Sequence, residues 1–143
     1  EADMETLLAT LSAGIDELEL RAPGVEIGTV GFCFGGAMVW NMLQAGDSRL
    51  SAASPFYGPA PPSPEFSRAN AAVFAVYAGN DDRVNASREE AVAALEASGL
   101  TYKVKTFEGV DHAFFNDTGP RYDEAAATEA YALLLDWFAQ HLA

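Results

Sequence analysis

The stretch Gly31-Phe32-Cys33-Phe34-Gly35-Gly36 decides the fold of this chain. It closes a short apolar run at residues 25–30 and opens a helical pattern at residues 37–43. The sequence therefore predicts a strand that turns sharply into a helix, with a thiol at the turn. Glycines two residues before and two residues after the cysteine remove Cβ atoms that would clash in so tight a turn. The positive end of the helix dipole favours a thiolate there, so Cys33 is a candidate nucleophile.

Two other interpretations of this turn are open. Glycine-rich turns between a strand and a helix also bind phosphate groups in doubly wound folds. A lone cysteine can instead be a small buried hydrophobic residue, because free cysteine is among the most buried residue types. The residues that follow the later strands decide between these interpretations.

The composition suits one domain that spans residues 1–143, because 50% of the residues are hydrophobic and can build a sizeable core. Eight basic residues against 21 acidic ones give a net charge of -13, which argues against binding to nucleic acid or to anionic membranes. The single cysteine excludes an internal disulfide, and no segment resembles a signal peptide or a membrane span. We therefore expect a cytoplasmic protein.

Helical patterns alternate with short apolar runs along the chain. The patterns predict helices at about residues 3–20, 37–45, 86–98 and 124–142, and strands at 25–30, 51–57, 71–77 and 100–107. A proline-rich loop and an irregular segment interrupt this order at residues 58–64 and 108–121. The alternation predicts an α/β fold, in which helices cover both faces of a parallel sheet of about four strands.

The loops after the predicted strands carry the candidate chemistry. In a parallel α/β sheet, reactive groups gather at the carboxyl ends of the strands, so these loops should share one rim. Asp81 and Asp82 follow the third strand and His112 follows the fourth. Cysteine, aspartate and histidine thus occur in the chain order of enzymes with a nucleophile elbow. This order favours catalysis over the other two interpretations of the turn.

Nucleophilic attack on an ester carbonyl needs each of these residue types. An imidazole can take a proton from the thiol of Cys33 and return it near neutral pH, and His112 is the candidate for this task. A carboxylate that holds the other ring nitrogen fixes the tautomer. The backbone N–H of Phe34, the residue after the nucleophile, is the first candidate for the oxyanion hole. Asp111 lies beside the histidine but on the wrong loop for the orienting acid.

Three segments of the sequence resemble the dienelactone hydrolase family of the α/β-hydrolases: the cysteine turn, the run Tyr77-Ala-Gly-Asn-Asp-Asp-Arg-Val-Asn85, and residues 109–118. In the family's acid loop the aspartate lies three residues before the valine, which selects Asp81 over Asp82. The resemblance implies a triad of Cys33, Asp81 and His112. It also implies a carboxymethylenebutenolidase-like hydrolase of small esters or lactones that needs no cofactor. The residues do not imply a metal, because two distant histidines and one cysteine do not make a plausible zinc site.

The chain departs from the family in two respects. Family members carry several strands before the elbow, so the resemblance implies that this chain corresponds to the C-terminal half of the fold. The elbow strand would then have an open edge, and we expect a homo-oligomer or a partner chain that supplies the N-terminal half. The founding enzyme also has an arginine for the substrate carboxylate where this chain has Asn116. Arg83 and Arg121 could serve anionic substrates, but solvated surface positions are the more frequent case for such residues.

Two further functions compete with catalysis. A half-fold could act as a structural or binding subunit that keeps the triad but needs a partner to complete the sheet and the oxyanion hole. Cys33 could also be a redox-sensing thiol, although the chain holds no second cysteine to resolve a sulfenic acid.

Overall fold

The computed structural model describes residues 3–142 and contains a four-stranded sheet in the order β1-β2-β3-β4. All three strand pairs are parallel. The strands are β1 (Ile27–Phe32), β2 (Leu50–Phe56), β3 (Ala72–Ala78) and β4 (Tyr102–Phe107); the helices are α1 (Met4–Arg21), α2 (Phe34–Ala45), α3 (Asp82–Asn85), α4 (Arg88–Ser98) and α5 (Glu124–His141). The predicted α/β fold is confirmed.

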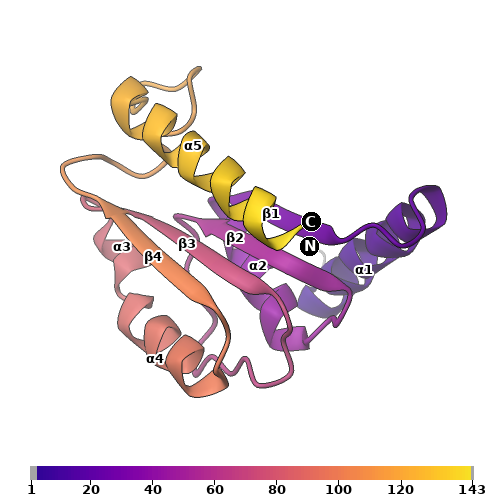
Figure 1. The fold of residues 1–143 in the computed structure, drawn as a ribbon. Helices are drawn as coiled ribbons and strands as arrows, with labels where there is room; N and C mark the ends of the chain where they lie inside the picture. Colours follow the sequence, from indigo (N-terminus) through magenta and orange to yellow (C-terminus); the bar gives the residue numbers. More distant parts are fainter. Residues whose placement is uncertain (1–2, 143) are drawn as a thin grey trace.

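The sheet separates two hydrophobic cores. Helix α5 lies across one face, and α2 and α4 lie across the other (Figure 1). Phe74 and Trp137 belong to the core under α5, whereas Trp40 and Leu95 belong to the core on the opposite face. Every residue of β3 is buried, as expected for a central strand of a parallel sheet whose two faces are both covered.

Two helices differ from the sequence prediction. Helix α2 begins at Phe34, three residues earlier than its apolar pattern indicates, because the chain turns into helix directly after Cys33. The predicted helix at 86–98 is α4, and the short helix α3 precedes it unpredicted. The side chain of Asp81 caps α3 by accepting a hydrogen bond from the backbone N–H of Val84. A cap of this kind can stabilise a single helical turn, which is too short to show a periodic pattern in the sequence.

The two edges of the sheet differ in chemistry. Strand β4 carries Lys103 and Lys105, and lysines are typical of edges protected against further pairing. Strand β1 pairs only with β2 among the described residues and exposes the side chains of Val30 (39%) and Phe32 (37%). Helices α1 and α5 also expose large apolar side chains, among them Met4, Leu11, Leu18, Tyr131 and Leu135. Within the described residues, the outer edge of β1 therefore has two exposed apolar side chains and no strand partner.

Within residues 3–142, no helix combines the length and the hydropathy that a membrane span requires.

Candidate active site

Cys33 lies at the turn between β1 and α2, with a positive φ of 56° and a ψ of -115°. Gly31 must lack a side chain, because a Cβ there would lie 2.2 Å from the carbonyl oxygen of Gly35. A Cβ on Gly36 would lie 2.5 Å from the carbonyl oxygen of Phe56. The Cβ position of Gly35 meets no atom within 4 Å, so the expectation that the glycine two residues after the cysteine avoids a clash is wrong. The second glycine that the turn requires is Gly36.

The structure brings Cys33, His112 and Asp81 into one line of contacts. The Nε2 atom of His112 lies 3.0 Å from the Sγ of Cys33, and its Nδ1 lies 2.5 Å from Oδ2 of Asp81. These side chains follow β1, β4 and β3, whose parallel pairing places their carboxyl ends along one rim. A carboxylate can only accept hydrogen bonds, so Asp81 favours the tautomer with a proton on Nδ1. The Nε2 atom is then free to exchange a proton with the thiol.

The two neighbouring aspartates have different environments. Asp81 is 6% exposed and uses both oxygens: Oδ1 accepts a hydrogen bond from the Val84 N–H at 3.3 Å, and Oδ2 faces His112. Asp82 is the exposed first residue of α3. The helix cap thus fixes the orientation of the carboxylate that contacts the imidazole.

Asp111 also makes a defined contact. Its Oδ1 accepts a hydrogen bond from the side-chain amide of Asn80 at 3.0 Å. This bond joins the loop after β3 to the loop after β4, which hold Asp81 and His112 respectively. Asp111 therefore connects the two loops of the site.

Tyr57 packs against the imidazole and was not among the predicted site residues. Its ring packs edge-on against that of His112 at a centroid distance of 5.1 Å. The buried ring of Phe114 also packs edge-on against Tyr57, at a centroid distance of 5.6 Å. Tyr57 adopts a positive φ of 34°, and burial together with the nearby charge of Cys33 raises its pKa to about 12. The sequence signal that could have identified Tyr57 as a site residue is its position at the end of the second predicted strand, directly before Gly58, on the same rim.

An open pocket of about 460 Å³ lies beside the thiol. Its lining residues are Phe32, Cys33, Tyr57, Ala113, Phe115, Asn116 and Asp117. The rings of Phe32 and Phe115 stack at a centroid distance of 5.0 Å and form an apolar wall. Phe34 is the first residue of α2, where a backbone N–H has no partner within the helix and can receive an oxyanion. The pocket can hold a small apolar acyl group next to the sulfur.

Asn116 lines the same pocket, whereas the two candidate arginines and the second histidine of the chain, His141, do not. The amide oxygen of Asn116 accepts hydrogen bonds from the backbone N–H and the hydroxyl of Thr118 at 3.2 and 2.8 Å. Arg83 and Arg121 are exposed, and neither lines the pocket. His141 packs on Trp137 at the C-terminal end of α5. Within residues 3–142, no group of three His, Cys, Asp or Glu side chains is placed to hold a metal ion.

Comparison with known proteins places the chain among similar sequences and structures. A protein of Salmonella typhi named "Putative carboxymethylenebutenolidase" is 28% identical over 165 residues, which cover 98% of this chain and 61% of that protein. A protein of the same name from Aquifex aeolicus is 31% identical over 124 residues, or 82% of this chain and 52% of that protein.

The crystal structure titled "Putative Dienelactone Hydrolase" from Klebsiella pneumoniae matches with a TM-score of 0.80 and 28% identity. The match covers 96% of this chain and 62% of that one. The chain thus spans about half to three fifths of the length of these relatives. The profile of the Dienelactone hydrolase family matches residues 1–142. The chain therefore belongs to the dienelactone hydrolase family of α/β-hydrolases.

Proposed function

We propose that the chain is a cysteine-dependent hydrolase that cleaves small esters or lactones. Cys33 is the nucleophile, His112 the base and then the acid, and Asp81 the group that orients the imidazole. The observation that carries the proposal is the continuous contact from the sulfur through the imidazole to the carboxylate, at 3.0 and 2.5 Å. Membership of the family and the names of its relatives support the reaction class.

The first half of the reaction transfers the acyl group to sulfur. His112 takes the thiol proton, and the thiolate of Cys33 attacks the carbonyl carbon. The carbonyl oxygen gains a negative charge that the N–H of Phe34 stabilises; one such donor contributes about 100- to 1000-fold in rate. The tetrahedral intermediate then expels the alkoxide, which takes the proton from the imidazolium. A thioester on Cys33 and a free alcohol result.

Water completes the cycle. A water molecule gives a proton to Nε2 of His112 as its oxygen attacks the thioester carbon. The carbon–sulfur bond breaks, and the departing thiolate recovers the proton from the imidazolium. The products are a carboxylic acid and an alcohol, which remain joined in one hydroxy acid when the substrate is a lactone. No electron is exchanged with another molecule in either half.

Hydrolysis of p-nitrophenyl acetate tests this function. The wild-type chain should show turnover and an acetyl group on Cys33 that mass spectrometry detects after acid quenching. Cys33→Ala and His112→Ala should reduce turnover to the background rate. The control Asp82→Asn changes the neighbouring, exposed carboxylate and should retain turnover. Equal rates in the wild type and in both triad variants would contradict the proposal.

The edge of β1 supports a second candidate function, a structural or binding subunit without turnover. Val30 and Phe32 are exposed on a strand whose outer backbone groups have no partner among the described residues. About two fifths of the length of the relatives from Salmonella typhi and Klebsiella pneumoniae lies outside the region that matches this chain. We propose that a second polypeptide pairs with β1, either a segment equivalent to that additional length or another copy of this chain.

Size-exclusion chromatography with light scattering tests this pairing. A dimer of the isolated chain identifies a second copy as the partner. Aggregation of the isolated chain that a polypeptide with the relatives' additional segment suppresses identifies that segment. A stable, fully folded monomer at micromolar concentration would contradict the pairing. Background esterase rates in the wild type, Cys33→Ala and His112→Ala alike would favour the subunit without turnover over the hydrolase.

A further inference from the structure

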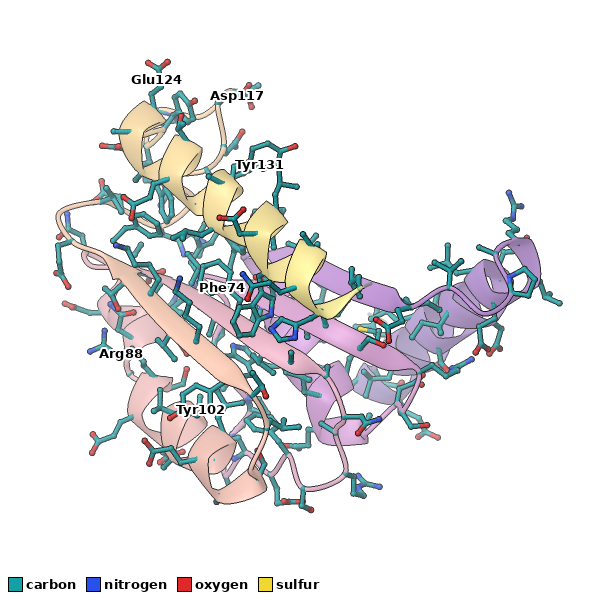
Figure 2. All side chains as sticks on the ribbon, viewed as in Figure 1. Phe74, Arg88, Tyr102, Asp117, Glu124 and Tyr131 are labelled. Carbon is teal, nitrogen blue, oxygen red and sulfur yellow. The ribbon has the colours of Figure 1, made fainter. Side chains whose placement is uncertain are left out.

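A second pocket adjoins the pocket of the nucleophile. It has a volume of about 300 Å³ and is lined by Phe115, Asp117, Tyr122, Ala127, Thr128 and Tyr131. Phe115 and Asp117 line both pockets, so the two pockets are neighbours. Figure 2 shows Asp117 on the loop that precedes α5 and Tyr131 on α5 itself.

The second pocket combines aromatic rings with a carboxylate. The ring centroid of Tyr131 lies 6.4 Å from that of Phe115, and the residues Tyr131 and Tyr122 are 53% and 40% exposed. Ring faces attract a cation that lies within about 6 Å of their centroids, and aromatic cages of this type recognise quaternary ammonium groups. The carboxylate of Asp117 adds a negative charge at the junction of the two pockets. This combination fits an ammonium group.

The basic side chains of the chain lie elsewhere. All eight belong to the described residues, and none of them lines either pocket. Six make contacts away from the site: Arg21 with Glu17, Arg49 with Asp47, Arg68 with the carbonyl of Gln44, Arg88 with Thr106, Lys105 with Glu129, and Lys103 over the ring of Phe74. A net charge of -13 also attracts cationic ligands and repels anionic ones. The remaining two, Arg83 and Arg121, are exposed and line neither pocket, so the linings of the two pockets hold the carboxylate of Asp117 and no basic side chain.

We infer that the site prefers esters that carry an ammonium group a few bonds from the ester carbonyl. The acyl group lies beside Cys33, and the ammonium group lies in the second pocket, against Tyr131 and Asp117. This inference rests on the proposed function for its reaction but not for its binding site. Among esters of equal size, it predicts the highest kcat/KM for the cationic ester, a lower value for the neutral ester and the lowest value for the anionic ester.

Matched esters test this order. Acetylcholine and 3,3-dimethylbutyl acetate have nearly the same shape and differ by one charge, and 3-acetoxypropionate supplies the anion. The ratio of kcat/KM for the cationic ester over the neutral one should be about tenfold, within the range of cation–π attraction. Asp117→Asn and Tyr131→Leu should lower the ratio several-fold, whereas Tyr131→Phe should preserve it. The control Asp136→Asn makes the same charge change on an exposed part of α5 and should leave the ratio unchanged.

A second measurement does not require turnover. Methanethiosulfonate reagents transfer their thioalkyl group to a thiolate, forming a disulfide and releasing methanesulfinate. We expect the trimethylammonium-ethyl reagent to modify Cys33 faster than the sulfonatoethyl reagent. The ratio of these two rates should be at least several-fold higher for Cys33 than for the free thiol 2-mercaptoethanol under the same conditions. Asp117→Asn should lower this ratio more than Asp136→Asn does.

The two measurements separate the failure of this inference from the failure of the proposed function. Absence of ester turnover together with charge-selective modification of Cys33 would refute the hydrolase and support the ammonium pocket. Turnover that depends on Cys33 but shows the same kcat/KM for acetylcholine and its neutral analogue would refute the ammonium pocket and support the hydrolase. Equal effects of Asp117→Asn and Asp136→Asn on both ratios would also overturn the inference, because net charge alone would then explain them.

Discussion

Replacement of Asp81 by asparagine should strongly impair catalysis while the fold is retained. The reason lies in the two contacts of the carboxylate. Oδ1 accepts a hydrogen bond from Val84 N–H at 3.3 Å, and Oδ2 lies 2.5 Å from Nδ1 of His112. If the asparagine oxygen keeps the cap, its NH₂ group takes the place of Oδ2. The amide then donates to Nδ1, the ring proton moves to Nε2, and Nε2 can no longer accept the proton of Cys33.

The alternative orientation also has a cost. Turning the amide so that its oxygen faces Nδ1 breaks the helix cap, which contributes about 1 kcal/mol, and still leaves the imidazolium without a neighbouring charge. In a serine protease the equivalent exchange lowers kcat by about 10⁴, through the wrong tautomer. We therefore expect Asp81→Asn to lower kcat/KM for p-nitrophenyl acetate by about 10³ to 10⁴, or about 4 to 5.5 kcal/mol. The free energy of unfolding should fall by less than about 1 kcal/mol, because the cap survives.

The matched control is Asp82→Asn, which makes the same chemical change one residue further along, at an exposed position. It should alter kcat/KM by less than about twofold, as is usual for a surface carboxylate away from the reacting atoms. Steady-state kinetics and urea unfolding of both variants provide the measurements. More than a tenth of wild-type activity in Asp81→Asn, or an equal loss in Asp82→Asn, would refute the reasoning.

Three further outcomes are expected. Gly36→Ala should destabilise the fold by about 1–3 kcal/mol in urea unfolding, because its Cβ would lie 2.5 Å from the carbonyl oxygen of Phe56, whereas Gly35→Ala has open space and should not destabilise. Phe114→Ala removes a fully buried ring and should lower the free energy of unfolding by about 3–5 kcal/mol. Because the folded-state pKa of Tyr57 is raised to about 12 from 10.0, its contribution to stability should be complete below pH 10 and should be lost as the pH rises to 12. Tyr57→Phe should make stability in that range less dependent on pH, and an unchanged slope would contradict this assignment.

Local patterns in the sequence were sufficient for the architecture. Periodic apolar residues predicted four strands and the main helices, because backbone geometry imposes these periods on any element with a buried face. The turn at Cys33 was predictable for the same kind of reason, since glycines around a thiol between a strand and a helix satisfy a local steric requirement. Chain order then placed Asp81 and His112 on loops of one rim. Only this last inference joins distant segments, and it follows from the rule that parallel strands end at one edge of the sheet.

Contacts between distant segments had to come from the tertiary structure. The pattern could not place Tyr57 against His112, because that contact depends on the register of β2 and on the positive φ at the end of that strand. It also misidentified the second essential glycine, since the atom that Gly36 avoids belongs to β2, twenty residues away. The shared wall of the two pockets likewise depends on how the loop before α5 packs on the rim. Periodicity and turn chemistry are local, whereas the distances between side chains on different strands are set by packing, and packing is what determined the composition of this site.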